Sequence, residues 1–208
     1  LFSIALSAMR VLPDPAETGA VTIALPEDVQ AETFEVPLEF LQDREWHIRR
    51  PRPEREALAR AVEVIRNAKN PMIIAGGGVL YSSAEQQLQA LVEQTGIPVG
   101  TSQAGGGVLN WDHAQNLGGV GATGTLAANR IAGEADVIIG IGTRYSDFTT
   151  ASRTAFQNPD VKFVNINVAS FDTYKHGSQL PVIAAAREAL TELIDALQGF
   201  RITKVYAR

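Results

Sequence analysis

The sequence contains no cysteine among its 208 residues. This absence excludes a disulfide scaffold and thiolate metal sites, and it is compatible with the cytoplasmic location that we expect. No apolar run is long enough for a membrane-spanning helix, and a net charge of −5 gives no basic surface for nucleic acid. The composition therefore predicts a globular α/β domain with extra segments, whose partners are neither membranes nor nucleic acids.

Catalytic motifs are also scarce. The 3 histidines, His47, His113 and His176, lie far apart in the sequence, and none has the spacing typical of a metal site. No Gly-x-Ser-x-Gly elbow is present to support a serine hydrolase triad. We therefore assign no catalytic residue and no metal ligand to this chain.

Two apolar runs that end in glycine organise the sequence. The run 70–75 leads into three consecutive glycines at 76–78, and the run 136–141 leads into Gly142, Thr143 and Arg144. Short apolar runs stopped by glycine are typical of buried parallel strands followed by tight turns. We expect the turn at Gly77 to need positive φ or the close approach of another backbone or a phosphate.

The periodicity of the other segments completes an α/β pattern. Predicted helices at 53–67, 82–95, 123–132 and 187–198 are interspersed with predicted strands at 72–75, 97–101, 117–121, 137–141, 162–168 and 180–184. Ser82 and Glu85 have the spacing of a capping box at the start of the second helix. We predict a Rossmann-like, doubly wound parallel sheet of about six strands in the order 3-2-1-4-5-6, with helices on both faces.

The sequence before this domain has a different character. Residues 1–12 have helical spacing and 20–25 have the pattern of a buried strand, a pair too small to close a core. We assign 1–30 to the end of a preceding domain, 31–52 to a linker, 53–199 to the α/β domain and 200–208 to the start of another linker. On this interpretation the chain is a fragment of a longer protein.

The glycine-ended turns are candidates for a nucleotide groove, because doubly wound folds bind ligands at the carboxyl edge where the strand order reverses. Two interpretations stay open: a groove for a nucleotide, or tight turns with a local ion pair between Arg144 and Asp147. The sequence lacks a complete Gly-x-Gly-x-x-Gly fingerprint, so we expect an unoccupied or weakly occupied groove with Arg144 engaged by protein groups. The candidate groove residues are Gly76, Gly77, Gly78, Gly142, Thr143, Arg144 and Asn167.

Several strings resemble the family of thiamine-diphosphate-dependent enzymes. Residues 19–30 resemble the exit from the pyrimidine-binding domain of that family, and the block 70–167 resembles its central domain. Residues 119–129, 142–152 and 164–172 resemble, more narrowly, the branch that hydrolytically opens a cyclic 1,2-diketone in myo-inositol catabolism. The resemblance covers nearly the whole chain.

This resemblance implies a parent enzyme with thiamine diphosphate, magnesium and a small-molecule substrate. It also implies two further domains in the same polypeptide, and assembly into a homo-oligomer. In the family the activating glutamate and the Gly-Asp-Gly stretch belong to those other domains, and no Gly-Asp-Gly occurs here. The resemblance thus implies a structural domain that is inactive alone.

Two alternatives remain. One is an FAD- or nucleotide-binding central domain of the acetolactate-synthase type, and the other is a stand-alone dinucleotide-binding protein. FAD binding is disfavoured by Asn167, which replaces the usual acidic residue, and by Tyr145 and Ser146, which replace a Phe-Asp-Asp pattern.

Overall fold

The computed structural model describes residues 2–203, and the chain forms two compact units, Leu1–Arg49 and Arg50–Arg208. Within the described residues, no helix combines the length and the apolar character needed to cross a membrane. Part of the linker predicted at 200–208, residues 204–208, lies outside the described residues.

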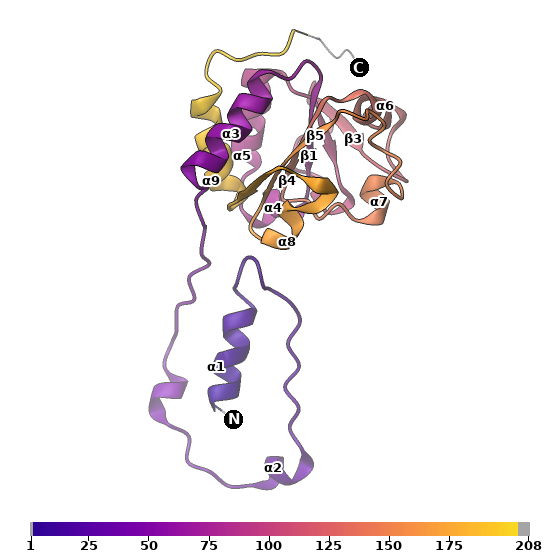
Figure 1. The fold of residues 1–208 in the computed structure, drawn as a ribbon. Helices are drawn as coiled ribbons and strands as arrows, with labels where there is room; N and C mark the ends of the chain where they lie inside the picture. The colour runs from indigo at the N-terminus through magenta and orange to yellow at the C-terminus, as the bar shows by residue number, and fades with distance from the viewer. Residues whose placement is uncertain (1, 204–208) are drawn as a thin grey trace. The chain divides into compact units, whose positions relative to one another are not determined.

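The second unit contains a six-stranded, entirely parallel sheet in the order β3-β2-β1-β4-β5-β6 (Figure 1). The predicted fold class and strand order are confirmed. Most predicted strand ends differ from the observed ones by only one or two residues. The strands are β1 (Pro71–Ala75), β2 (Val99–Thr101), β3 (Asn116–Gly119), β4 (Val137–Ile141), β5 (Lys162–Asn167) and β6 (Leu180–Ile183).

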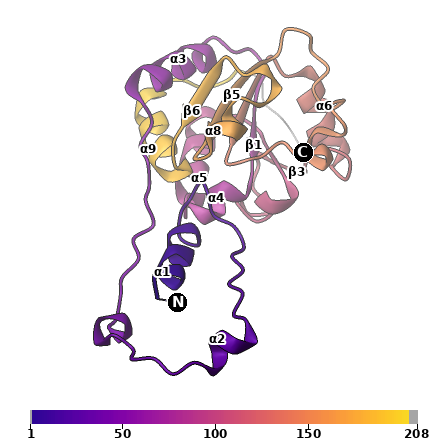
Figure 2. The same cartoon turned by 60° about the horizontal axis from the view of Figure 1, so that its bottom comes forward.

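Helices cover both faces of this sheet. They are α3 (Arg55–Arg66), α4 (Gly77–Tyr81), α5 (Glu85–Thr95), α6 (Leu126–Glu134), α7 (Asp147–Thr150), α8 (Ser170–Thr173) and α9 (Ala186–Ala196). Single 3-10 turns lie at η2 (Gln103–Gly105) and η3 (Lys175–Gly177). Figures 1 and 2 show α3, α5 and α9 on one side of the sheet and α6 on the other.

Alternation along the strands divides the interior into two cores. In β1, Ile73 and Ala75 belong to the core beneath α3, α5 and α9, whereas Met72 and Ile74 belong to the core beneath α6. Successive side chains of a strand point to opposite faces, so a strand covered on both faces is apolar throughout. All five residues of β1 are buried, as the continuous apolar run predicts.

The two ends of α5 bear on separate predictions. Gly96 ends this helix in the left-handed conformation (φ 73°), as expected. The capping box predicted at Ser82 and Glu85 for the start of the helix is wrong. The short helix α4 occupies 77–81, and α5 begins only at Glu85 with no side-chain cap. Ser82 is buried, and its Oγ accepts a hydrogen bond from the backbone N–H of Arg187 at 3.0 Å, so it caps α9 instead.

The first unit contains α1 (Phe2–Val11), α2 (Glu27–Ala31) and the 3-10 turn η1 (Leu38–Leu41). The ring of Phe2 packs on Phe40 at 4.7 Å and on Phe34 at 5.7 Å between centroids. The predicted buried strand at 20–25 is wrong, since that stretch is exposed and no strand forms within residues 2–49. A strand forms only where another strand satisfies its backbone groups, and this unit offers none among its described residues.

Candidate functional site

The candidate groove lies at the carboxyl edge of the sheet, between the neighbouring strands β1 and β4, where the strand order reverses its direction. The two strands pair in parallel from Pro71 opposite Val137 to Ala75 opposite Ile141. The turns that follow them also touch, since the N–H of Gly78 donates to the carbonyl of Gly142 at 3.0 Å. The expected meeting of the two glycine-ended turns at one edge is confirmed.

Close backbone contact explains the glycines of these turns. A Cβ atom added to Gly78 would lie 2.6 Å from the Cα of Gly142, and one added to Gly76 would collide with the carbonyl oxygen of Gly142. Gly142 itself has a φ of 59°, a backbone conformation that residues other than glycine rarely adopt. The glycines therefore let two backbones pack directly against each other.

Gly77 differs from its neighbours. Its φ is not positive, which corrects the expected left-handed conformation, and the positive φ of this site belongs to Gly142. A Cβ atom on Gly77 would lie 3.2 Å from both the Cβ and the carbonyl oxygen of Ala104. The expected close approach is thus present at Gly77, but its partner is η2.

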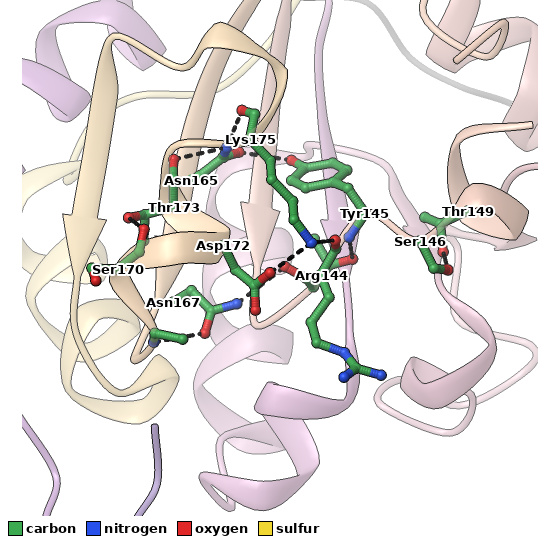
Figure 3. A network of polar contacts seen from close by, with 12 residues as sticks. Arg144, Tyr145, Ser146, Thr149, Asn165, Asn167, Ser170, Asp172, Thr173 and Lys175 are labelled. Atoms are coloured by element: carbon green, nitrogen blue, oxygen red, sulfur yellow. Dashed lines mark hydrogen bonds and ion pairs between the residues drawn. The ribbon is translucent and has the colours of Figure 1, made fainter. Parts of the chain in front are cut away.

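Asn167 ends β5, the next strand of the sheet, and its side chain is held on both sides. Its Nδ2 donates to the carbonyl of Thr143 at 3.1 Å, and its Oδ1 accepts from the N–H of Ala169 at 3.1 Å. The structure therefore brings Asn167 and Thr143 together as predicted. These bonds connect the turn after β4 to the turn after β5 (Figure 3).

We predicted that protein groups would engage the guanidinium of Arg144, and this prediction is wrong. Its side chain is exposed and makes no hydrogen bond or ion pair with any residue that the structure describes. Asp147 is not its partner, since Oδ2 of Asp147 accepts a hydrogen bond from Oγ of Ser152 at 3.2 Å. Figure 3 shows the guanidinium of Arg144 extending away from the strands, between the Ser146–Thr149 and Ser170–Thr173 segments.

Lys175 and Asp172, which the sequence reasoning missed, hold the backbone of this turn. Nζ of Lys175 donates to the carbonyl of Arg144 at 2.6 Å and pairs with Oδ1 of Asp172 at 2.7 Å (Figure 3). The carboxylate of Asp172 is largely buried, which strengthens a charge-assisted bond relative to one in water. The only signal for this ion pair in the sequence is an acidic and a basic residue three positions apart. That spacing is also common in exposed ion pairs on helices, so it does not single out this one.

Tyr145 turns back from the carboxyl edge into the core beneath α6. Its hydroxyl donates to Oδ1 of Asn165 at 2.8 Å, and Nδ2 of Asn165 donates to the carbonyls of Thr173 and Lys175, each at 3.1 Å. Gly140 makes room for this ring, because a Cβ atom there would collide with the hydroxyl of Tyr145. Burial raises the pKa of Tyr145, so the phenol stays protonated and keeps donating.

His176 closes the aromatic cluster around Tyr145. Its ring stacks on Phe163 at 5.0 Å between centroids, and it meets Tyr145 and Phe156 edge-on at 4.9 and 5.6 Å. Burial is the main cause that lowers the pKa of His176 below its ordinary value of 6.5, and the positive charges of Arg153 and Lys175 add to it. The neutral imidazole is therefore the form that the fold favours.

We expect acid to destabilise the second unit through His176. Because the pKa of His176 is lower in the folded chain, the unfolded chain binds more protons below pH 6.5, and stability falls as the pH drops through that value. The midpoint temperature of unfolding, measured between about pH 8 and pH 5.5, should fall less steeply in His176→Phe. His47→Phe, in the first unit, is the control, and equal slopes for all three proteins would contradict this role of His176.

A family model for the central domain of thiamine pyrophosphate enzymes matches residues 58–193. The chain belongs to this family. The match covers the second unit from α3 to α9, which includes both glycine-ended turns, Asn167 and the Lys175–Asp172 pair.

Curated relatives place the chain more narrowly within the family. It is 52% identical over 198 residues to 3D-(3,5/4)-trihydroxycyclohexane-1,2-dione hydrolase 1 of Bacillus cereus. It is 51% identical, again over 198 residues, to the 3D-(3,5/4)-trihydroxycyclohexane-1,2-dione hydrolase of Bacillus anthracis. In both cases the alignment covers 95% of this chain and 31% of the relative. The chain therefore spans about a third of the length of these relatives.

A solved structure of an enzyme described as thiamin diphosphate-dependent, from Mycobacterium smegmatis, has the same fold. The two structures superpose with a TM-score of 0.62 at 18% identity, over 79% of this chain and 31% of the other. At this level of identity the likeness concerns the fold alone.

The acidic and histidine side chains among the described residues are dispersed. Among residues 2–203 no group of three or more His, Cys, Asp or Glu side chains is placed to hold a metal ion. A cavity of about 470 Å³ does lie at the opposite, amino edge of the sheet, and it contains none of the predicted site residues. Its lining includes charges of both signs, from Arg60, Glu63, Asp136, Asp160 and Lys162.

Proposed function

We propose that this chain is the central domain of a thiamine-diphosphate-dependent hydrolase that opens a cyclic 1,2-diketone by hydrolysis of a C–C bond, in myo-inositol catabolism. The observation that carries this proposal is the identity of about half over 95% of the chain to hydrolases of that name. The relatives favour this function over the acetolactate-synthase-like alternative and over a stand-alone dinucleotide-binding protein.

The domain division is part of the proposal. Residues 1–30 are the end of the pyrimidine-binding domain, 31–52 a linker, 53–199 the central domain, and 200–208 the start of a linker to a third domain. The whole enzyme is cytoplasmic and homo-oligomeric, and it binds thiamine diphosphate with magnesium through its other two domains. The central domain serves as a rigid spacer between them, and its continuous parallel sheet suits that role.

The proposal is tested by comparing the full-length parent protein with this chain. We expect the full-length protein, given thiamine diphosphate and magnesium, to hydrolyse trihydroxycyclohexane-1,2-dione to a ring-opened acid, and this chain to be inactive. In calorimetry this chain should release no heat of binding with thiamine diphosphate and magnesium. A micromolar affinity of this chain alone, about −8 kcal/mol, would contradict the assignment of the cofactor to the other domains.

We infer that the groove formed by Gly76, Gly77, Gly78, Gly142, Thr143, Arg144 and Asn167 is vestigial as a nucleotide site. Two amides of these turns already have protein partners: Gly78 donates to the carbonyl of Gly142 at 3.0 Å, and Gly142 to that of Ile166 at 2.8 Å. A diphosphate would have to break these bonds, and an amide hydrogen bond given up without replacement costs about 1–3 kcal/mol.

We expect FAD and ADP to bind this chain only weakly or not at all. Titration of FAD with the chain should leave the flavin fluorescence unchanged, and ADP should not raise the midpoint temperature of unfolding. The variant Arg144→Ala serves as the comparison. Removal of this side chain should change neither the flavin fluorescence nor the midpoint temperature. A micromolar affinity for FAD that Arg144→Ala abolishes would favour the flavin-binding alternative instead.

A further inference from the structure

Left-handed backbone is concentrated in one region of the second unit. Among residues 2–203, the residues other than glycine with a φ in the left-handed range are Ser83, Tyr145, Ala151, Ser152, Arg153 and His176. Tyr145 and His176 contact each other within the aromatic cluster. Residues 151–153 lie in the connection between β4 and β5, which also carries Phe156 of that cluster. Strained residues of this kind gather at ligand clamps and switch regions.

The three residues that follow α7 form a consecutive left-handed turn, with φ of 47° at Ala151, 53° at Ser152 and 66° at Arg153. A Cβ atom makes this conformation unfavourable, and none of the three residues is a glycine that would relieve it. The local sequence does not demand the turn, since residues 147–158 contain neither glycine nor proline, the residues that break right-handed helices. The left-handed turn is therefore imposed by its surroundings.

Hydrogen bonds to α7 hold this turn closed. The N–H of Ser152 donates to the carbonyl of Asp147 at 3.1 Å, and the N–H of Ala155 donates to that of Thr150 at 3.0 Å. Oγ of Ser152 also donates to Oδ2 of Asp147 at 3.2 Å. Ala155 is buried, but Ser152 and Arg153 are exposed, so water can replace the outer bonds. Segments with exposed hydrogen bonds and few buried contacts open at a fraction of the free energy of global unfolding.

The helix α7 in turn holds the glycine-rich loop 120–125, which follows β3. The carbonyl of Phe148 accepts a hydrogen bond from the N–H of Ala122 at 2.8 Å. Gly121 packs so closely against the same carbonyl that a Cβ atom there would collide with it. A movement of α7 therefore also releases the loop 120–125.

We propose that residues 147–155 are a strained latch, which opens and closes at the carboxyl edge while the sheet and its two cores stay folded. In the open latch, residues 151–153 leave the left-handed conformation, and the amides of Ser152, Ala155 and Ala122 lose their acceptors on α7. Relief of the backbone strain offsets part of the cost of these hydrogen bonds, so the open latch is a populated minor state.

Hydrogen exchange followed by mass spectrometry tests the latch in the full chain of 208 residues. We expect peptides from 147–155 and 120–125 to exchange about a hundredfold faster than peptides from β1 and β4, because local opening needs far less free energy than global unfolding. Their exchange should also be insensitive to low concentrations of urea, which accelerate only openings that expose much surface. Exchange of 147–155 at the rate of β4 would overturn the proposal.

The variant Ala151→Gly tests the strain itself. Glycine tolerates the left-handed conformation, so peptides from the latch and from 120–125 should exchange roughly two- to fivefold more slowly, and the midpoint temperature should rise. The matched control is Ala127→Gly, the same change at an exposed position of the right-handed helix α6. It should lower the midpoint and leave exchange of the latch unchanged. Unchanged or faster exchange of the latch in Ala151→Gly would overturn the proposal.

A pair of variants at Arg153 separates backbone strain from the side chain. Arg153→Gly should slow exchange of the latch, whereas Arg153→Ala, which keeps the Cβ atom, should not. Equal effects of the two variants would contradict the role of strain. Slower exchange of 147–155 without slower exchange of 120–125 would contradict the coupling to that loop. These measurements need neither cofactor nor turnover, so their outcome is independent of the proposed hydrolase activity.

Discussion

Replacement of Gly142 by alanine is expected to destabilise the second unit by about 3–5 kcal/mol, among the largest effects of a single methyl group in a protein. Two costs combine. A Cβ atom on Gly142 would lie 2.5 Å from the Cα of Gly78, and the residue must keep a φ of 59°. Left-handed backbone costs a residue with a Cβ atom roughly 1–2 kcal/mol, and the collision can be relieved only by separating the turns after β1 and β4.

Thermal unfolding followed by circular dichroism measures this effect, and the midpoint should fall by roughly 10 °C. The matched control is Gly133→Ala in α6, where the nearest atom to an added Cβ, the carbonyl oxygen of Ala155, lies 3.7 Å away. Because alanine is the better helix former by about 1 kcal/mol, the control should be neutral or stabilised. Similar midpoints for the two variants would show that the turns after β1 and β4 are not in direct backbone contact.

Replacement of Asn165 by leucine is expected to cost about 3 kcal/mol, because it leaves the buried hydroxyl of Tyr145 and the carbonyl of Thr173 without their partner. The Asn165 side chain is 2% exposed, and it satisfies the hydroxyl of Tyr145 and the carbonyls of Thr173 and Lys175. Leucine has a similar volume but no hydrogen-bonding atoms. Urea denaturation should show the loss as a lower midpoint with an unchanged slope.

Tyr145→Phe provides the graded comparison for Asn165→Leu. It removes one hydroxyl and leaves only Oδ1 of Asn165 without a donor, so about 1–2 kcal/mol is expected. The double variant should cost less than the sum of the two single variants, since each removes the partner of the other. Strictly additive costs would mean that the hydroxyl of Tyr145 and the amide of Asn165 do not interact.

The strand order was predictable because the apolar runs of β1 and β4 mark them as the strands buried at the sheet centre. Both runs end in glycine, and right-handed crossovers leave few ways to arrange six such strands. The meeting of the turn after β1 with that after β4 followed from the same order. The resemblance of strings such as 142–152 to one branch of the family was likewise predictable from the residues alone, as the relatives at 52% identity show.

The roles of individual polar side chains were not predictable in the same way. Arg144 and Asp147 are close in the sequence, yet Asp147 bonds to Ser152 and the carbonyl of Arg144 bonds to Lys175, 31 residues further along. Ser82 has the spacing of a local cap but caps α9, which starts about a hundred residues later. Spacing in the sequence constrains only partners within a turn of helix. The contacts of Lys175 with Arg144 and of Ser82 with Arg187 join segments far apart in the sequence, which the packing of the sheet brings together.

The sequence by itself determined the α/β class, the two glycine-ended strands at the sheet centre and the family. The class and the two strands rest on hydrophobic periodicity and on the conformational freedom of glycine, which are properties of short stretches of chain. The family rests on the resemblance of whole strings such as 142–152. Only the tertiary structure decided that the glycines pack backbone against backbone, that the amides of Gly78 and Gly142 already have partners, and that Arg144 is left exposed. Each of these depends on distances between segments far apart in the sequence, and such distances are set by how the whole sheet packs.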